Sequence, residues 1–277
     1  MGAEGADVYV AGTLARWVAT RRPGQAAVDL PGIHGLLPCP ERPRARLLVT
    51  DDRAYDTLAA LLPDLHAGAI DVFDAAIRCA GLIDGQCGWW VSERSTAMVC
   101  GDLRSVPASE LPSELTLRRV RRLSGDPPEG VPLEDARAAV LLADPRIEDP
   151  DAFADFLDSL PPEAHLFAAV DRDGVVRATS GLVALGSEGR VFFVNTVPGW
   201  RGRGIGQAMT AAAVHAALEH GAERVCLDAT GAGLGIYRRL GFETVSQSTR
   251  FTAPLSAPAS RGEPHHRGDG GRCRPSE

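Results

Sequence analysis

The sequence predicts a mixed α/β fold in two parts, and three observations predict it. From Glu114 onward, short apolar runs and amphipathic runs follow one another in the order β-α-α-β-β-β-α-β-α-β. A strand, a glycine-rich turn and a helix occupy residues 190–218 within that order. Before residue 112, patterns typical of helices and of strands also alternate, but on a smaller scale. We therefore expect a smaller α/β domain over residues 1–112, a larger one over 113–252 and a disordered tail over 253–277.

The N-terminal part is expected to consist of short elements broken by turns. Pro-Gly and Pro-Cys-Pro sequences interrupt residues 1–45, so this stretch is predicted to be mainly loops. The expected elements are, in order, a helix at 13–21, a strand at 46–50, helices at 51–62 and 67–79, strands at 87–91 and 97–100, and a linker at 103–112.

The second part shows a more regular pattern. Its expected elements are a strand at 115–120, helices at 133–142 and 150–160, strands at 166–170, 175–183 and 191–196, a helix at 207–218, a strand at 225–228, a helix at 234–240 and one or two closing strands at 244–252. Aromatic and β-branched residues favour the central strand 191–196, and Gly221 suits the end of the helix that follows it.

Composition argues against several classes of function. The formal net charge is −7, whereas a protein that binds nucleic acid usually presents a basic face. All 29 basic side chains are arginine, so the chain has no lysine for a phosphate loop or a Schiff base. The six cysteines form no CxxC pair and no metal-ligand spacing. We therefore expect neither a metal nor a nucleic-acid partner.

The sequence also suggests where the protein works. Its N-terminus is acidic, unlike that of a secretory signal peptide, and no stretch of about 18 apolar residues could span a bilayer. We expect a cytoplasmic protein without a membrane partner, while a homodimer is left open. The codons of lysine and asparagine are AT-rich, so the absence of lysine and the single Asn195 indicate a GC-rich bacterial genome.

The glycine-rich turn 197–206 is predicted to bind an anion. Glycines between a strand and a helix let the backbone approach a ligand, and the N-terminus of a helix presents free N–H groups. The dinucleotide fingerprint does not fit, because the third glycine is missing after Gly204 and Gly206. These features predict a site for a phosphate or pyrophosphate.

Two motifs around this turn carry a resemblance to a known family. Arg201-Gly202-Arg203-Gly204-Ile205-Gly206 reads R-x-x-G-x-G, and Tyr237-Arg238-Arg239-Leu240-Gly241-Phe242 reads Y-x-x-L-G-F. Together and in this strand order, they resemble the GNAT superfamily of acyltransferases over roughly residues 113–252. The resemblance implies a mixed sheet that splays open between the strands 191–196 and 225–228, with acyl-CoA in the gap. The N-terminal part resembles the accessory, degenerate GNAT-like domain that precedes some bacterial GNAT domains, where it would cover the acceptor side.

The resemblance also implies which groups hold acetyl-CoA. Main-chain groups of Val194, Asn195 and Thr196 would pair with the pantetheine arm and the thioester carbonyl. The Asn195 side chain would orient the substrate or sit in the β-ladder. Arg201 would close the turn or meet a phosphate, and Arg203 would reach the phosphates of the nucleotide. The pyrophosphate would be held by the N–H groups of Gly202, Arg203, Gly204, Ile205, Gly206 and Gln207.

Catalytic roles follow from the chemistry of thioester aminolysis, which needs an oriented amine, an N–H donor for the oxyanion and a proton donor for the thiolate. Tyr237 aligns with the tyrosine acid of the family, although a tyrosine here could also serve only for packing. Asp228, at the end of its strand, is a candidate base. Its alternatives are a plain turn or cap carboxylate and a water relayed by backbone carbonyls, while Glu188 is expected in a solvated turn.

These features predict an acetyl-CoA-dependent N-acetyltransferase that acylates a primary amine of a small molecule by direct attack. One alternative is a non-catalytic acyl-CoA-binding or regulatory protein. Another is an acetyltransferase that acts on a protein or an aminoacyl-tRNA, for which the clustered arginines at 118, 119, 121 and 122 are the argument.

Overall fold

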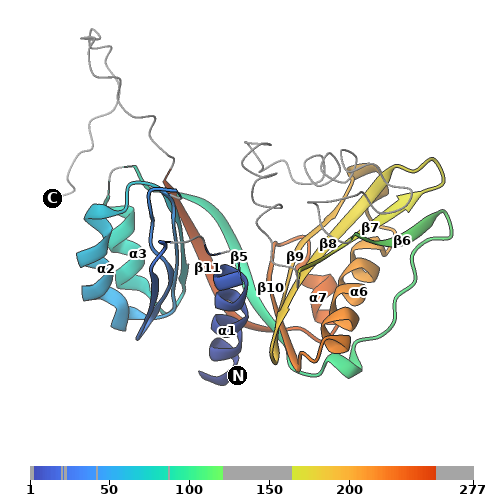
Figure 1. Cartoon of the computed structure of the whole chain (residues 1–277), viewed down its shortest axis with the longest axis horizontal. Helices are drawn as coiled ribbons and strands as arrows, with labels where there is room; N and C mark the ends of the chain where they lie inside the picture. The colour runs from blue at the N-terminus through green and yellow to red at the C-terminus, as the bar shows by residue number, and fades with distance from the viewer. Residues whose placement is uncertain are drawn as a thin grey trace, which may run out of the picture. The chain divides into compact units, whose positions relative to one another are not determined.

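The structure is a computed structural model that describes residues 3–19, 21, 24–41, 43–86, 88–120 and 164–253 (Figure 1). The chain forms two compact units. The larger unit comprises Met1–Arg21 and Ser95–Gln247, and the smaller unit comprises Arg22–Arg94 and Ser248–Glu277. The predicted helices at 133–142 and 150–160 and the predicted tail lie outside the described residues.

The sheet of the larger unit has the strand order β5-β10-β9-β8-β7-β6. Neighbouring strands are antiparallel except for the parallel pair β9 and β10. The strands are β5 (Trp90–Cys100), β6 (Leu115–Val120), β7 (Ala164–Asp171), β8 (Val176–Leu185), β9 (Glu188–Thr196) and β10 (Arg224–Ala229). This arrangement confirms the predicted mixed α/β sheet.

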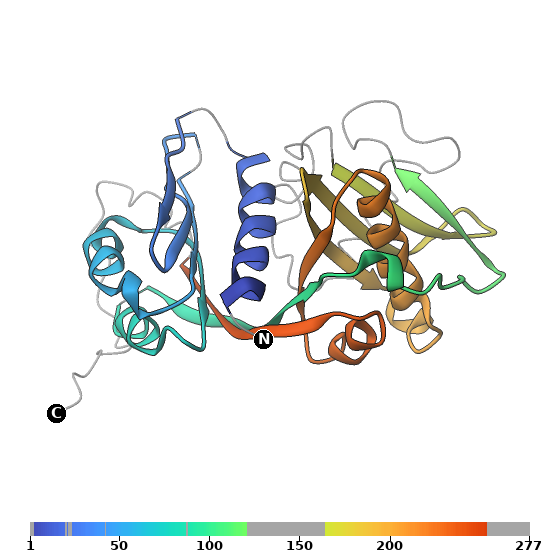
Figure 2. The same cartoon turned by 90° about the horizontal axis from the view of Figure 1, so that it is seen from below.

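Two helices of the larger unit pack on opposite faces of this sheet (Figure 2). Helix α6 (Ile205–Glu219) packs on β7, β8 and β9, and helix α1 (Ala3–Ala19) packs on β8, β9 and β10. Alternation along β10 separates the faces: Val225 and Leu227 join the core beneath α6, whereas Cys226 and Asp228 contact side chains or backbone of α1. The short helix α7 (Leu234–Arg239) completes the core on the α6 face.

The parallel strands β9 and β10 are paired at only three positions. Glu188 pairs with Arg224, and the last pair is Arg190 with Cys226. Beyond that pair the two strands have separate neighbours, β8 for β9 and β5 for β10. The predicted splay between 191–196 and 225–228 is therefore confirmed. Glu188 is not in a solvated turn, because it begins β9 and forms an ion pair with Arg224 at 2.6 Å.

Helix α1 lies very close to the sheet at Gly12. A Cβ at this position would stand 2.6 Å from the Cys226 Sγ and 3.1 Å from the Gly189 carbonyl oxygen. Gly12→Ala is therefore expected to lower the free energy of unfolding by about 1–3 kcal/mol in a urea titration. Adding Cys226→Ala should recover part of that loss, because it removes the nearer atom.

A matched control for this variant is Gly81→Ala in helix α3 (Ile77–Asp84) of the smaller unit. Nothing lies within 4 Å of a Cβ at Gly81, so alanine there should stabilise by about 0.5–1 kcal/mol through its better helix propensity. Equal and small effects of Gly12→Ala and Gly81→Ala would contradict the close packing of α1 on the sheet.

The smaller unit contains its own sheet and core. The strand order is β1-β2-β3-β4-β11, and only β3 and β4 run parallel. Its elements are β1 (Ala27–Leu30), β2 (Ile33–Leu36), β3 (Ala45–Val49), α2 (Tyr55–Leu61), β4 (Gly68–Phe73), α3 (Ile77–Asp84) and the part of β11 (Glu243–Ala253) from Ser248 onward. Ile33, Leu47, Leu58, Ile70 and Ile83 are fully buried in its core.

Several N-terminal predictions are wrong in detail. The expected helix at 67–79 is the strand β4 followed by α3, because both edges of β4 are paired, with β3 on one side and β11 on the other. The expected loop at 27–36 is the hairpin of β1 and β2, and the expected helix at 13–21 begins at Ala3. The two expected strands of 87–100 form one strand, β5.

The compact units also differ from the predicted domains 1–112 and 113–252. Helix α1 packs on strands of the larger unit, and β5 from Ser95 onward pairs with β10 in that unit. In the other direction, β11 from Ser248 onward pairs with β4 of the smaller unit. Each unit is therefore built from two separated segments of the chain.

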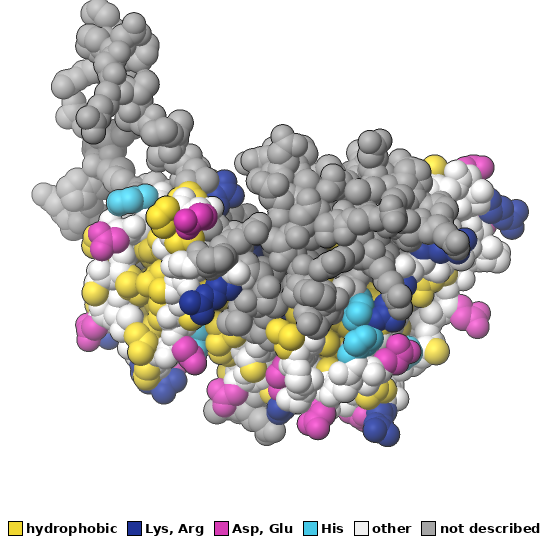
Figure 3. Space-filling model, in the orientation of Figure 1, with side chains coloured by type: hydrophobic (Ala, Val, Ile, Leu, Met, Phe, Trp, Pro, Cys, Tyr) yellow, Lys and Arg dark blue, Asp and Glu magenta, His cyan; other side chains and the backbone are white. Residues whose placement is uncertain are grey.

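The described surface carries acidic and basic side chains interspersed with one another on the face shown in Figure 3. Among the described residues, no helix is both long enough and apolar enough to cross a bilayer.

Candidate active site

The turn between β9 and α6 exposes its glycine backbone in front of the helix. Gly202 and Gly204 have φ values of 76° and 77°, a left-handed conformation that glycine adopts without strain. Nothing lies within 4 Å of a Cβ built on either residue. The backbone of this turn is therefore exposed to any molecule that lies against it.

The N–H groups of this turn and of the first turn of α6 are available. Gly204 is the N-cap of α6 and provides no side-chain cap, and the first bond of the helix runs from the Ala208 N–H to the Gly204 carbonyl at 3.1 Å. Within the described part of the chain, no acceptor pairs with the backbone N–H groups of residues 202–207. A cluster of such groups at the positive end of a helix favours an anion.

The polar side chains of the turn are held by the protein itself. The Arg201 Nε donates to the Thr196 carbonyl at 2.9 Å, so this side chain closes the turn. Arg203 forms an ion pair with Glu114 and lies over the Trp200 ring at 4.6 Å. Gln207 donates to the Ser109 hydroxyl at 3.2 Å. The backbone rather than these side chains is thus the open part of the site.

Strand β9 carries a bulge where it leaves β10. The register against β8 shifts between Thr179 and Gly181, and Phe193 has a φ of 49°. The Thr179 hydroxyl donates to the Phe193 carbonyl at 3.1 Å. A bulge redirects the backbone groups next to it, and a non-glycine residue in this conformation is typical of a functional constraint. Here the next residues are Val194, Asn195 and Thr196, which are half-buried.

Asn195 has a polar atom that the protein does not satisfy. Its backbone is paired with Thr179 in the β-ladder, whereas its Nδ2 is buried without a hydrogen-bond partner among the described residues. Leaving a buried donor unpaired costs about 1–3 kcal/mol. This amide is therefore a candidate for a ligand contact, next to the bulge and to the glycine turn.

Tyr237 lies in α7 with 7% of its surface exposed. Its ring packs edge-on against Phe242, and a Cβ at Gly233 would stand 2.7 Å from it. No described residue forms a hydrogen bond with its hydroxyl. Burial, together with the nearby charge of Asp228, raises the pKa of Tyr237 to about 12. The phenol is therefore protonated at neutral pH and available as a proton donor.

Asp228 is engaged by two side chains that the sequence did not single out. Its carboxylate forms an ion pair with Arg190 of β9 and accepts a hydrogen bond from the Tyr9 hydroxyl of α1. Its charge also contributes to the raised pKa of Tyr237. The one signal for Arg190 in the sequence is its position at the start of an apolar strand; no pattern points to Tyr9.

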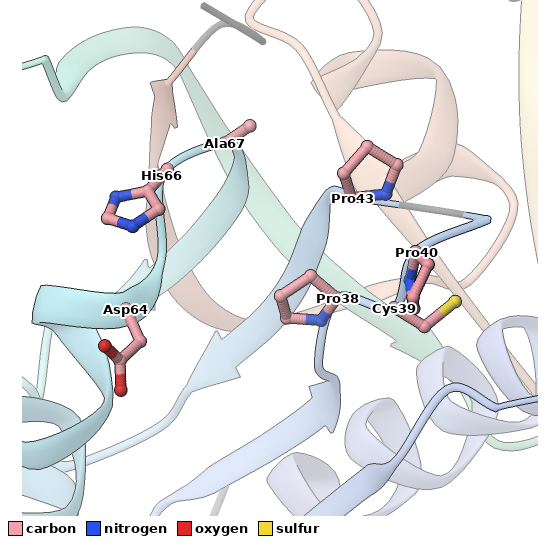
Figure 4. Close-up of a pocket in the computed structure, with 7 residues that line it drawn as sticks. All are labelled: Pro38, Cys39, Pro40, Pro43, Asp64, His66 and Ala67. Carbon is pink, nitrogen blue, oxygen red and sulfur yellow. The ribbon is translucent and has the colours of Figure 1, made fainter. Parts of the chain in front are cut away.

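A separate hollow lies in the smaller unit (Figure 4). It has a volume of about 410 Å³. Its walls come from the β2–β3 connection and from the segment after α2, with the residues Pro38, Cys39, Pro40, Pro43, Asp64, His66 and Ala67. Within the described residues, no group of three or more His, Cys, Asp and Glu side chains could hold a metal ion.

Comparison with known proteins relates this site to the acetyltransferase (GNAT) domain. Residues 162–244 match the model of the acetyltransferase (GNAT) domain. The structure is similar to a GCN5-related N-acetyltransferase from Kribbella flavida, with a TM-score of 0.60, 21% identity and coverage of 89% of this chain and 95% of that chain. No curated protein sequence matches the chain significantly.

Two further solved structures have the same fold. A GCN5-related N-acetyltransferase from Sphaerobacter thermophilus has a TM-score of 0.53 and 18% identity, and the match covers 89% of this chain and 92% of that one. A tandem GNAT protein from the clavulanic acid biosynthesis pathway has a TM-score of 0.54 and 16% identity, and the match covers 93% and 90%. At these identities the likeness shows the fold, which is that of GNAT proteins.

Proposed function

Residues 162–244 carry a GNAT acetyltransferase domain, and from this premise we propose that the protein is an acetyl-CoA-dependent N-acetyltransferase acting on a primary amine of a small molecule. The observation that carries the proposal is the glycine turn, with its unpaired N–H groups at the N-terminus of α6. It lies directly after the strand that parts from its parallel neighbour. We further propose that the protein works in the bacterial cytoplasm, without a membrane or nucleic-acid partner.

The residues present fit acetyl-CoA. The open space beside Gly202 and Gly204 would admit a pyrophosphate to the backbone N–H groups of the turn. The bulged part of β9 offers main-chain groups of Val194 and Thr196 to a pantetheine arm, and Asn195 offers its unsatisfied amide. When bound, acetyl-CoA supplies an activated acetyl thioester. The oxyanion that develops during the reaction would meet an N–H donor near the bulge.

In this proposal two side chains carry out the proton transfers. Tyr237 donates its phenolic proton to the leaving sulfur. The raised pKa of Tyr237 keeps the phenol protonated until that step. Asp228 accepts an N–H of the attacking amine and is the candidate proton acceptor. A water relayed by backbone carbonyls is the alternative base, because the Asp228 carboxylate is already stabilised by Arg190.

The contacts of Arg119 weaken the argument for a protein or tRNA acceptor. Arg119 of β6 lies against His165 and His220, with its Nη2 at 2.9 Å from the His165 Nδ1 and 3.3 Å from the His220 Nε2. The predicted arginine cluster is therefore in part engaged by histidines of the same unit. No described feature favours a non-catalytic acyl-CoA-binding protein over an enzyme.

The proposal is tested with a panel of primary amines. The full chain is incubated with acetyl-CoA and each amine, and free thiol is followed with confirmation of the product by mass spectrometry. We expect a thermal shift with acetyl-CoA alone and thiol release with at least one amine. Absence of a thermal shift with any acyl-CoA would refute the acyl-CoA assignment, whereas a shift without any turnover would favour the non-catalytic alternative.

A further inference from the structure

The segment 103–114 lies along helix α6 and ends at the glycine turn. It begins with a short 3₁₀ helix at Leu103–Ser105, and Leu103 and Val106 are buried in the core that α6 shares. Polar contacts then join the segment to α6 and to its turn, and their partners come in reverse order: Val106 with His215, Ser109 with Gln207 and Glu114 with Arg203. The segment therefore runs antiparallel to α6, and its last side chain reaches the proposed anion site.

Glu114 is presented by an anchored turn. The Leu115 N–H donates to the Pro112 carbonyl at 2.8 Å, and the Leu115 side chain is buried. A hydrogen bond from its own backbone N–H and the contact with Arg203 lower the pKa of the Glu114 carboxyl, with a smaller effect of Arg172. Glu114 is therefore a negative charge held beside the glycine turn at neutral pH.

Arg203 is held in this place by two weak contacts. Its guanidinium lies over the partly buried Trp200 ring at 4.6 Å and forms the ion pair with Glu114. The side chains of Arg203 and Glu114 are 39% and 42% exposed. Ion pairs with this exposure contribute little to stability, because water competes for both partners. Arg203 can therefore exchange Glu114 for another anion at a small cost.

Two other arginines next to the turn are held differently. Arg201 donates to the Thr196 carbonyl at 2.9 Å and closes the turn. Arg177 pairs at 2.6 Å with Asp171, whose side chain is only 8% exposed. Two backbone N–H groups also donate to this Asp171 carboxylate, so Arg177 is bound to a fixed partner. Of these three arginines, Arg203 is the one whose charged partner is accessible to solvent.

We propose that Glu114 is a positioning residue that holds Arg203 beside the turn in the free protein and releases it to a phosphate group of acyl-CoA when that ligand binds. The inference rests on the proposed acetyltransferase function and deepens it, because a carboxylate of the protein then competes with the ligand for one guanidinium. A phosphate accepts paired N–H bonds from a guanidinium as a carboxylate does. It also gains the unpaired N–H groups of the turn, so the exchange favours the ligand.

The exchange affects the substrate and the product of the proposed reaction alike. Breaking the ion pair of Glu114 with Arg203 offsets part of the binding free energy of the phosphates, and CoA carries the same phosphates as acetyl-CoA. Glu114 should therefore weaken the binding of both ligands. In Glu114→Gln, inhibition by CoA should strengthen by the same factor as the binding of acetyl-CoA.

The test is the Kd of acetyl-CoA, measured by isothermal titration calorimetry at low ionic strength. Glu114→Gln removes the competing charge and keeps the shape of the side chain, so acetyl-CoA should bind about twofold to fivefold more tightly. The matched control is Glu110→Gln in the same segment. It makes the same change of charge at an exposed residue that has no ion pair among the described residues, so its Kd should equal that of the wild type.

A double-mutant cycle separates the exchange of partners from plain repulsion. If Glu114 acts through Arg203, the gain from Glu114→Gln should be smaller in an Arg203→Ala background. Direct repulsion between the Glu114 carboxylate and the phosphates would instead give an equal or larger gain there. All four proteins of the cycle should melt at similar temperatures, because the ion pair is exposed.

A series of acetyl thioesters identifies the phosphate. Acetyl-dephospho-CoA lacks the 3′-phosphate of the ribose, and acetyl-pantetheine lacks every phosphate. A gain in Glu114→Gln that persists with acetyl-dephospho-CoA assigns Arg203 to the pyrophosphate, whereas a gain that disappears assigns it to the 3′-phosphate. Acetyl-pantetheine should show no gain, and a gain with this donor would contradict an exchange with phosphate.

The outcomes distinguish the inference from the function on which it rests. Unchanged or weaker binding of acetyl-CoA in Glu114→Gln overturns the inference, as does an equal or larger gain in the Arg203→Ala background. In both cases a wild type that binds acetyl-CoA and releases thiol leaves the acetyltransferase function standing. A wild-type chain that neither binds acetyl-CoA nor releases thiol with any amine refutes the proposed function and the inference together.

Discussion

Tyr237→Phe is expected to lower kcat about 10²–10³-fold in the thiol-release assay while acetyl-CoA binds as tightly as in the wild type. In the proposed mechanism the phenol donates the proton to the leaving sulfur, and phenylalanine keeps the ring contact with Phe242. The hydroxyl has no hydrogen-bond partner among the described residues, so its removal should not lower the melting temperature. Loss of turnover without loss of stability or binding is the signature of a proton donor.

The pH dependence gives an independent check on this role. A tyrosine must be protonated to act as an acid, and the pKa of Tyr237 is raised to about 12. As pH rises, its proton is therefore lost later than that of an ordinary tyrosine, and the wild-type rate should show no alkaline fall from this group below about pH 10. A Tyr237→Phe variant with wild-type kcat at every pH would contradict the role and leave protonation of the sulfur to water.

The conformation of the glycine turn could be predicted from the sequence because it is local. Strand, glycines and helix follow one another within 190–218, and the positive φ values of Gly202 and Gly204 are what glycine in such a turn provides. The splay between the strands was expected from the resemblance and is confirmed by the short pairing of β9 with β10. No pattern in the sequence indicated the bulge at Phe193, because the bulge depends on the register of β9 against β8.

The contacts between helix α1 and strand β10 could not be predicted, because they join distant parts of the chain. Tyr9 and Asp228 meet across 219 positions, and no spacing in a single sequence reports such a contact. The prediction of a helix at the position of β4 was wrong for a related reason. The apolar residues of β4 suit a helix or a strand equally, and the strands β3 and β11 on either side decide between them. The boundaries of the compact units likewise depend on the long-range pairing of β5 with β10 and of β11 with β4.

Gly204→Asp is expected to weaken acetyl-CoA binding by more than about 100-fold, measured as the Kd by isothermal titration calorimetry. Aspartate tolerates the left-handed conformation that Gly204 adopts, and nothing lies within 4 Å of its Cβ. Its carboxylate would stand where the pyrophosphate is expected and would repel it. The isosteric Gly204→Asn fills the same space without the charge, so the ratio of the two affinities isolates electrostatic repulsion from steric exclusion.

Stability should move in the opposite direction from binding in this variant. A negative charge near the N-terminus of a helix stabilises it by about 0.3–1 kcal/mol, so Gly204→Asp should melt no lower than Gly204→Asn. Gly221→Asp provides the matched control at the other end of α6, since Gly221 has a φ of 83° and equally open surroundings. There the charge opposes the helix dipole, so the melting temperature should fall while acetyl-CoA binding is retained. Wild-type affinity in Gly204→Asp would place the pyrophosphate away from the N-terminus of α6, because a carboxylate and a pyrophosphate cannot share the same N–H groups.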